Sequence, residues 1–313
     1  MMNRPIKISL VAPVYGVERF IADFADSAFQ QTYPHIEYIF VNDGTKDNSI
    51  QVLDSVIESK YSHLKDQVKI INKTNAGLPA ARKTGVEHAT GDYIWHVDPD
   101  DWLELDAAES IVKTIEETGA DVVYFNLFKE YTERSKIKRD RPHAADARGE
   151  YVWDMFNHKS FGSVCNKCIK RSLYENERVI FAKYSYAEDT FLTSQLVGYS
   201  KCISFLDKPL YHYRKTNPNS ITRQNLKKRH REYALNFMRL YDHYRDLPLS
   251  ESPIASIHDE ILIKIGWYTI LYGVDLYKDY PYLAEDIRKA KVNRTADVFI
   301  LGQWLAKIKA MFK

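Results

Sequence analysis

The chain has 313 residues, enough for one large domain or two modest ones with a buried core, and too many for a disulfide-stapled miniprotein. Hydrophobic residues make up 45% of it, and 44 Lys and Arg nearly balance 42 Asp and Glu to leave a net charge of +2. This balance provides no extended positive field, so we expect no nucleic acid partner.

The first part of the sequence alternates short apolar runs with amphipathic segments. Strands are expected at residues 8–12, 36–41, 68–71, 93–97 and 122–125, with helices at 17–28, around 53–57, at 79–89 and at 106–118. Neighbouring parallel strands need a crossover, and helices supply it with right-handed connections. The alternation predicts an α/β fold with a doubly wound, mostly parallel sheet, whose ligands bind beyond the carboxyl ends of the strands.

The second half of the sequence has a less regular pattern. Residues 132–148 are highly charged and are predicted to be a mobile loop, and the following elements are a helix near 190–198 and strands at 202–205 and 210–213. Beyond Asn225 the pattern is helical, with apolar stripes along residues 254–265 and 301–312. We therefore expect a domain at 1–222, divided into halves at 1–126 and 127–222, and a C-terminal helical region at 223–313.

Several features bear on the compartment. Residues 1–5 lead directly into the first strand without the apolar segment of a secretory signal, and no run of about 18 apolar residues suggests a membrane span. Cys165, Cys168 and Cys202 form an odd set without the second pair that a zinc site needs, so buried thiols are expected. Together these features favour a reducing cytoplasmic location.

Three carboxylates lie close together in the segment Asp98, Pro99, Asp100 and Asp101, directly after an apolar run. Such carboxylates repel one another unless a cation or hydrogen-bond donors neutralise them. Mg²⁺ and Mn²⁺ often combine one or two carboxylates with phosphate oxygens, so the cluster is typical of a divalent metal held against a diphosphate. The same residues could instead cap and charge a helix, and the tetrad alone leaves both interpretations open.

Two further polar clusters follow predicted strands. Asp43, in the turn after residues 36–41, can accept hydrogen bonds from a nucleobase or ribose, or order its own loop as an Asx-turn. Gly77 and Pro79 suit a loop that enters a helix, whose N-terminus favours anions, and Arg82 would add positive charge there. Because parallel strands end at one edge, the three clusters are expected to converge.

The order of these clusters resembles glycosyltransferase family 2, a large group of enzymes with the GT-A fold. Four motifs match it within about one third of the chain, a combination much more specific than any single motif. The matches are Pro13, Val14 and Tyr15 to Pro-Val-Tyr, residues 42–49 to Asp-Gly-Ser-x-Asp-x-Ser with Thr45 for the serine, Asn75, Gly77 and Arg82 to Asn-x-Gly…Ala-Arg-Asn with Lys83 for the last Asn, and residues 98–101 to Asp-x-Asp-Asp.

The resemblance implies an inverting enzyme that uses a nucleotide-sugar donor, with uridine diphosphate as the expected carrier. It implies a divalent metal, Mn²⁺ or Mg²⁺, bound by Asp100, and it places Asp98 near the ribose. The implied nucleoside pocket consists of Pro13, Val14, Tyr15, Asp43 and Arg82, with Asp98 beside them.

Later segments extend the resemblance. Glu188 and Asp189 resemble the Glu-Asp motif near the acceptor, where the Asp is the general base, although an ordinary helix N-terminus has the same acidic pair. Arg214 resembles the family's Tyr-Tyr-Arg…Ser segment, and its charged fork suits diphosphate oxygens. His212 is a candidate metal ligand with a structural histidine as the alternative, and Lys167 belongs to an Asn-Lys pair with a role at the diphosphate or acceptor.

Inversion requires one in-line displacement, in which Asp189 would deprotonate an acceptor hydroxyl while the metal at Asp100 neutralises the leaving diphosphate. The expected acceptor is a glycan or a lipid-linked saccharide in the synthesis of cell-surface polysaccharide. A metal-dependent sugar nucleotidyltransferase and a non-catalytic nucleotide-sugar-binding protein remain alternatives. In the last stripe, Trp304 and Phe312 among lysines suit either a packed helix or peripheral contact with the inner face of the membrane, and the oligomeric state is left open.

Overall fold

The computed structural model describes residues 4–218, 220, 225–272, 276 and 279–289. Within this part of the chain a nine-stranded sheet has the order β3-β2-β1-β4-β8-β6-β9-β5, and β7 pairs with β6 at the side. The strands are β1 (Ile8–Val14), β2 (Ile36–Asn42), β3 (Val68–Asn72), β4 (Tyr93–His96), β5 (Trp102–Leu103), β6 (Val122–Glu130), β7 (Ser135–Lys138), β8 (Lys167–Lys170) and β9 (Ile203–Arg214).

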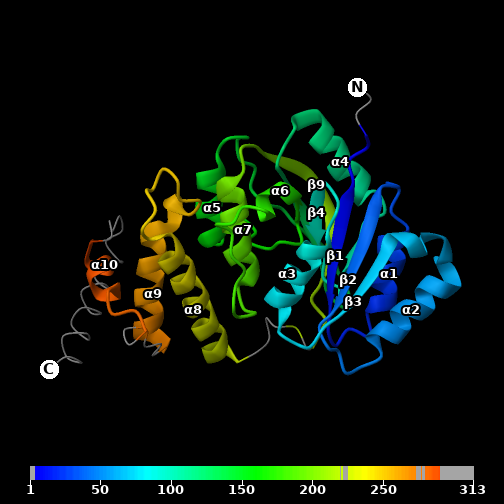
Figure 1. The fold of residues 1–313 in the computed structure, drawn as a ribbon, viewed down its shortest axis with the longest axis horizontal. Coiled ribbons are helices and arrows are strands. Elements are labelled where there is room, and N and C mark those ends of the chain that lie inside the picture. Colours follow the sequence, from blue (N-terminus) through cyan, green and yellow to red (C-terminus); the bar gives the residue numbers. More distant parts are fainter. Residues whose placement is uncertain (1–3, 219, 221–224, 273–275, 277–278, 290–313) are drawn as a thin grey trace.

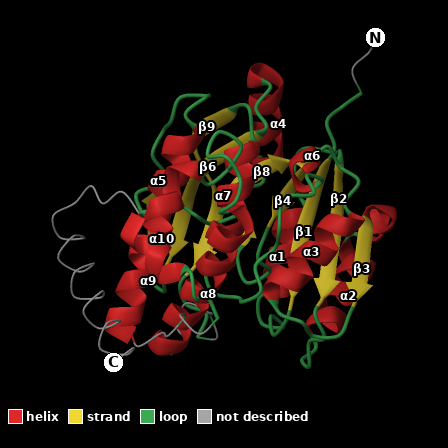
Figure 2. Ribbon diagram, turned by 60° about the vertical axis from the view of Figure 1, so that its left-hand side comes forward, coloured by secondary structure: helices red, strands yellow, loops and turns green. Residues whose placement is uncertain are grey.

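Helices cover both faces of the sheet and extend it at one end, where α8, α9 and α10 lie far from α1 and α2 (Figure 1). Figure 2 shows the strands as one continuous twisted layer between the helices. The helices are α1 (Ile21–Phe29), α2 (Ser49–Lys60), α3 (Leu78–His88), α4 (Ala107–Thr118), α5 (Arg148–Phe156), α6 (Arg171–Tyr174), α7 (Glu188–Tyr199), α8 (Leu226–Tyr244), α9 (His258–Tyr272) and α10 (Leu283–Lys289), with short 3₁₀ turns η1 (Ser62–Gln67) and η3 (Ala255–Ile257).

The first four strands confirm the predicted doubly wound arrangement. β1 pairs in parallel with β2 and β4, and β2 pairs in parallel with β3. β8 then lies antiparallel between β4 and β6, and β6 pairs in parallel with β9, so the sheet is mixed in its second half. The parallel strand ends therefore share one edge, and β9 brings a later segment of the chain to the same sheet.

The alternation of side chains along β1 separates two buried cores. Leu10 and Ala12 belong to a core with α1, α2 and α4, whereas Val11 belongs to a core with α3, α5, α7 and α8. The second core continues into the C-terminal helices, where the stripe predicted along residues 254–265 is buried. The stripe predicted along residues 301–312 lies outside the described residues.

Two sequence predictions differ from the structure in the second half of the sheet. Residues 132–148 are not a structureless loop, because β7 pairs antiparallel with β6, and its exposed polar side chains explain why the pattern concealed it. The two strands predicted at 202–205 and 210–213 are one strand, β9. The break around Asp207 and Pro209 is a β-bulge, in which the Asn126 Nδ2 atom donates to Asp207 Oδ1 over 2.7 Å.

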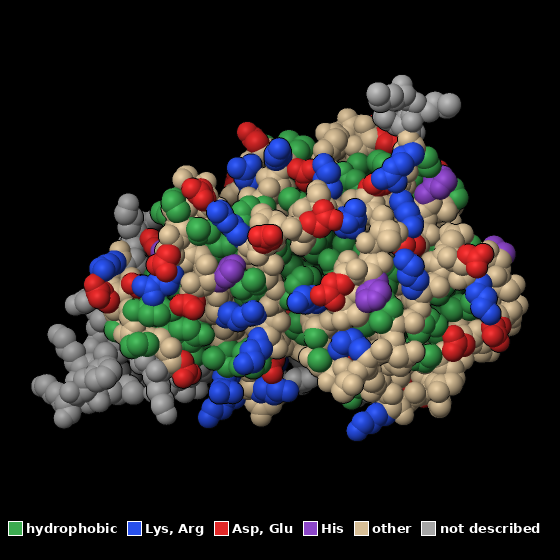
Figure 3. Space-filling view, viewed as in Figure 1, with side chains coloured by type: hydrophobic (Ala, Val, Ile, Leu, Met, Phe, Trp, Pro, Cys, Tyr) green, Lys and Arg blue, Asp and Glu red, His purple; other side chains and the backbone are tan. Residues whose placement is uncertain are grey.

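No helix among the described residues combines the length and the apolar character needed to cross a membrane. On the face shown in Figure 3, basic and acidic side chains are interspersed, in agreement with the small net charge of +2.

The close packing of α3 on β1 gives a test of the core. A Cβ atom added at Gly85 would overlap Val11 Cγ1, so we expect Gly85→Ala to lower the free energy of unfolding by about 1–3 kcal/mol. The matched control is Gly266→Ala in α9, where an added Cβ meets no described atom within 4 Å and helix propensity favours Ala. Urea unfolding checks both variants, and equal stability of Gly85→Ala and wild type would contradict the packing.

Candidate active site

A compact hydrogen-bond network joins the turn after β2 to the turn after β1. Asp47 accepts hydrogen bonds from the Thr45 and Ser49 hydroxyl groups over 2.7 and 2.6 Å, and from the backbone N–H of Glu18 over 3.0 Å. The Thr45 hydroxyl in turn accepts from the Gly16 N–H over 2.9 Å. The residues of the Asp-Gly-Ser-x-Asp-x-Ser pattern therefore position the end of β1, where Pro13 and Val14 are buried and Tyr15 is 52% exposed.

Asp43 organises the loop that leads into α3. Its buried carboxylate accepts hydrogen bonds from Lys73 Nζ over 2.6 Å and from the backbone N–H groups of Ala76 and Gly77 over 3.0 and 2.8 Å. Gly77 has φ +89°, a backbone conformation that favours glycine. Asp43 thus lies beside the loop that leads through Gly77 into α3, as expected. Its carboxylate is already engaged in fixing that loop.

A single buried guanidinium joins the two halves of the candidate site. Arg82, 1% exposed on α3, donates from Nε to Glu188 Oε1 and from NH2 to Asp98 Oδ1, both over 2.9 Å. Asp98 follows β4, whereas Glu188 begins α7, ninety residues later in the chain. Arg82 therefore holds the carboxyl end of the parallel strands against the start of α7.

The three carboxylates of the tetrad have different partners. Asp98 pairs with Arg82, and the buried Asp101 accepts from the Tyr211 hydroxyl over 2.6 Å and from the Arg214 backbone N–H over 2.7 Å. Asp100 accepts from Asn217 Nδ2 over 2.7 Å. Burial and the repulsion of Asp98 raise the pKa of Asp100, so its negative charge is incompletely neutralised within the protein.

Two sequence candidates on β9 have unexpected surroundings. Arg214 Nε donates over 2.8 Å to the backbone carbonyl of Asp100, which brings its guanidinium to the tetrad. His212 does not turn its ring nitrogens toward the tetrad, because Nδ1 lies 2.8 Å from Glu130 and Nε2 lies 2.7 Å from Glu104. A metal at His212 would have to displace one of these carboxylates from its ring nitrogen.

The remaining candidates lie near α7. Burial raises the pKa of Asp189, an effect that Arg82 opposes and Asp98 reinforces, so its carboxylate is a stronger base than an exposed aspartate. Lys167 is completely buried and donates to the backbone carbonyls of Phe161 and Ser163 over 2.6 and 2.8 Å and to an Asn166 oxygen over 3.0 Å. All three ammonium protons are used inside the protein, so contact with a ligand would require replacing one of these bonds.

Sequence reasoning missed three residues of this site. Asn217 contacts Asp100, Tyr211 contacts Asp101, and Trp102 lies under the Arg214 guanidinium, whose Cζ is 4.6 Å from the centroid of the ring. No local motif marks Asn217 or Trp102. Tyr211 lies in the segment that resembles Tyr-Tyr-Arg…Ser, but the segment assigns it no role, since each of the three acquires its role through a partner that is distant in the chain or on another strand. A polar residue beside the recognised Arg214 segment was the one signal that could have indicated Asn217.

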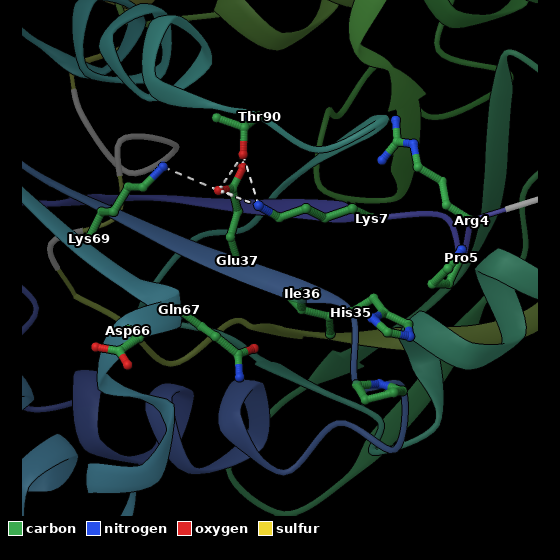
Figure 4. Close-up of a pocket in the computed structure, with 11 residues that line it drawn as sticks. Arg4, Pro5, Lys7, His35, Ile36, Glu37, Asp66, Gln67, Lys69 and Thr90 are labelled. Carbon is green, nitrogen blue, oxygen red and sulfur yellow. Dashed lines mark hydrogen bonds and ion pairs between the residues drawn. The ribbon is translucent and has the colours of Figure 1, made fainter.

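A cavity of about 530 Å³ lies at the opposite edge of the sheet, by the amino ends of β1, β2 and β3 (Figure 4). Figure 4 shows Glu37 at its centre, contacted by Lys7, Lys69 and Thr90. Bonds to Ser9, Thr90 and Lys7 outweigh burial and lower the pKa of Glu37 to about 2. This carboxylate is saturated with donors, so the cavity does not offer the unneutralised charge found at the tetrad.

Away from the tetrad, His143, Glu150 and Asp154 have ligand atoms that lie within 4.8 Å of one another, close enough to share a metal ion. Arg141 already lies 3.0 Å from Asp154 and 4.0 Å from Glu150, and His143 Nε2 lies 3.0 Å from Asp154. A guanidinium in the centre of the group neutralises these carboxylates, so this cluster is weaker than Asp100 as a cation site.

Two comparisons with known proteins, one with family models and one with individual proteins, agree on a glycosyltransferase family. The model of glycosyl transferase family 2 matches residues 9–178. A putative glycosyltransferase, EpsH of Bacillus subtilis, is 31% identical over 214 residues, which cover 66% of this chain and 60% of that protein. The aligned region thus spans less than two thirds of the relative's length.

Two solved structures resemble the fold. Staphylococcus aureus TarS 1–349 in complex with UDP-GlcNAc has a TM-score of 0.66 at 17% identity, covering 91% of this chain and 81% of that one. The mannosyltransferase PcManGT of Pyrobaculum calidifontis, in complex with GDP-Man and Mn²⁺, has a TM-score of 0.57 at 15% identity, covering 97% and 81%. At such identities the likeness shows the GT-A fold alone.

The Arg82 network predicts a pH-dependent stability. Burial, partly opposed by Arg82, raises the pKa of Glu188 to about 8. A carboxyl with a higher pKa in the folded chain binds more protons there, so its contribution to the free energy of unfolding falls as the pH rises from about 5 to 8. We expect the wild type to lose up to about 1.4 kcal/mol per pH unit relative to Glu188→Gln over this range.

Urea unfolding at several pH values checks this difference. The control is Glu87→Gln on α3, whose 55% exposed side chain lies 3.7 Å from Lys83 and should show no such difference from wild type. Parallel stability curves for wild type and Glu188→Gln would show that the buried carboxyl does not titrate in this range.

Proposed function

The chain belongs to glycosyl transferase family 2, and on this premise we propose that it transfers a sugar from a nucleotide diphosphate donor to a hydroxyl of a saccharide acceptor, with inversion. The observation that carries the proposal is the Arg82 network. It joins Asp98, on the proposed donor side, to Glu188, which precedes Asp189 in the chain on the proposed acceptor side. An in-line displacement needs both groups around one reacting carbon.

The proposed donor site lies where β1 and β2 end. The exposed ring of Tyr15 offers a surface for the nucleoside, the buried Pro13 and Val14 support it from below, and Asp43 and Arg82 fix the loop and helix beside it. We propose a uridine diphosphate carrier, an assignment supported by the UDP-GlcNAc bound to the similarly folded TarS. Asp98 is proposed to lie near the ribose.

A divalent cation suits the donor set around Asp100. Burial and the neighbouring carboxylates Asp100 and Asp98 raise the pKa of Asp101 well above its usual range, so three carboxylates are crowded together at this strand end. Asp100, with the amide of Asn217 beside it, would hold Mn²⁺ or Mg²⁺, which prefer such oxygen ligands. The Mn²⁺ in PcManGT supports this assignment. When bound, the ion would supply Lewis-acid neutralisation of the leaving diphosphate.

Asp189 is proposed as the general base. Its raised pKa brings its basicity closer to neutral pH, where a base is most effective, and it lies at the start of α7 within the proposed acceptor half. We propose a glycan or lipid-linked saccharide as the acceptor. The division into residues 1–222 and 223–313 remains part of this proposal, with acceptor contacts in residues 127–222.

Replacing the proposed base tests the reaction chemistry. We expect Asp189→Asn to lower the rate of acceptor-dependent release of nucleoside diphosphate at least about 100-fold, because the amide cannot take up the hydroxyl proton. Affinity for the donor should change little. A screen of UDP-sugars and GDP-mannose with Mn²⁺ and saccharide acceptors supplies the assay, and undiminished turnover in the variant would exclude Asp189 as the base.

Replacing the proposed metal ligand tests the donor site. In Asp100→Ala we expect the gain in nucleoside diphosphate affinity on adding Mn²⁺ to fall about tenfold or more, because an anionic oxygen ligand is lost. Calorimetric titration with and without Mn²⁺ measures this gain. The control is Asp66→Asn, an exposed residue at the opposite edge, and a full Mn²⁺ effect in Asp100→Ala would refute the assignment.

A further inference from the structure

Five planar groups from four separate elements form a continuous stack beside Asp100. The Phe128 ring lies 4.4 Å from the His212 ring at an interplanar angle of 14°, and His212 lies 4.9 Å from Trp102 at 11°. The Arg214 guanidinium follows at 4.6 Å from Trp102 and 5.0 Å from Phe20. We call these residues the stack.

The middle of the stack is fixed in its own plane. His212 contacts Glu130 at one ring nitrogen and Glu104 at the other, over 2.8 and 2.7 Å, while its two faces contact Phe128 and Trp102. Edge and face contacts together leave the imidazole little freedom to tilt or turn. The stacking contact with this fixed imidazole therefore orients Trp102.

The charged member of the stack, Arg214, lies beside Asp100 at the proposed donor site. Arg214 is held by Nε to the Asp100 carbonyl over 2.8 Å, and one terminal nitrogen lies 3.4 Å from Asp23. A guanidinium has five N–H donors, so these contacts with described residues leave donors for a ligand. The side chain is 18% exposed, which means that the group is largely shielded but still reachable.

We propose that Trp102 and His212 are positioning residues that hold the Arg214 guanidinium toward the diphosphate of the donor. This inference rests on the proposed function, because it takes the diphosphate to lie at Asp100. The stack fixes the plane of a side chain that otherwise has many rotamers, so its charged fork meets the phosphate oxygens with less loss of entropy. The positioning residues act through Arg214 and do not contact the donor themselves.

The test compares ligands that differ in one phosphate. UDP and UMP, or GDP and GMP if the guanosine pair binds, are titrated calorimetrically in Mn²⁺ against wild type, Trp102→Leu and Trp102→Phe. Loss of the aromatic face in Trp102→Leu should weaken the diphosphate about five- to thirty-fold and the monophosphate much less, whereas Trp102→Phe should stay near wild type. His212→Ala should change the diphosphate affinity in the same direction.

A double-mutant cycle shows whether the effect passes through Arg214. On an Arg214→Ala background, Trp102→Leu should cause no further loss of diphosphate affinity. Trp153→Leu is the matched control, because it removes a tryptophan that lies 4.3 Å from the Lys159 ammonium elsewhere in the molecule. It should leave the ratio of diphosphate to monophosphate affinity unchanged.

Two results would overturn the inference alone. One is a Trp102→Leu variant with the affinity ratio of the wild type, and the other is a loss that adds fully to that of Arg214→Ala. If Trp102→Leu does not fold, Arg214→Lys keeps the charge without the planar group, and an unchanged ratio there would count equally against it. Failure of the wild type to bind any nucleoside diphosphate would contradict the proposed function as well.

Discussion

The buried guanidinium of Arg82 is the interaction on which the arrangement of the site depends. A charge moved out of water costs several kcal/mol unless it is paired, and the partners of Arg82 are Asp98 and Glu188, at 2.9 Å each. Neither partner is near enough to Arg82 in the sequence for a single helix or turn to form the contact. Both the packing of α3 on β1 and the packing of α7 on the second core are therefore needed to compensate this charge. This requirement couples the proposed donor side to the proposed acceptor side in one folded state.

The need to compensate buried charges also determines the arrangement of the tetrad, residues 98–101. Asp98 pairs with Arg82, Asp101 accepts from the Arg214 backbone and the Tyr211 hydroxyl, and Asp100 accepts from the Asn217 side chain. Residues that fix the backbone thereby leave a single carboxylate for a cation. The loop between β4 and β5 is held from β9, so the long strand formed late in the sequence determines the geometry of a motif that occurs early.

The sequence predicted the elements whose signals are local. β1, β2 and β4 are continuous apolar runs, and their ends carry the motif residues, so the parallel half of the sheet and the convergence of Asp98 with Arg82 followed from the pattern. β7 and the bulge in β9 escaped because exposed polar residues and Pro209 imitate a loop. The partners of His212 could not be predicted, since its two glutamates are supplied by strand pairing.

The two edges of the sheet differ in how far their buried carboxylates are neutralised, and this difference separates the cavity around Glu37 from the proposed active site. At the amino edge, hydrogen bonds to Glu37 overcome burial and lower its pKa to about 2, so the ionised carboxylate stabilises the fold at neutral pH. At the carboxyl edge, burial raises the pKa values of Asp100 and Asp189, and their ionisation costs stability. Carboxylates with raised pKa values cluster at functional sites, which agrees with the proposed cation at Asp100 and the proposed base Asp189.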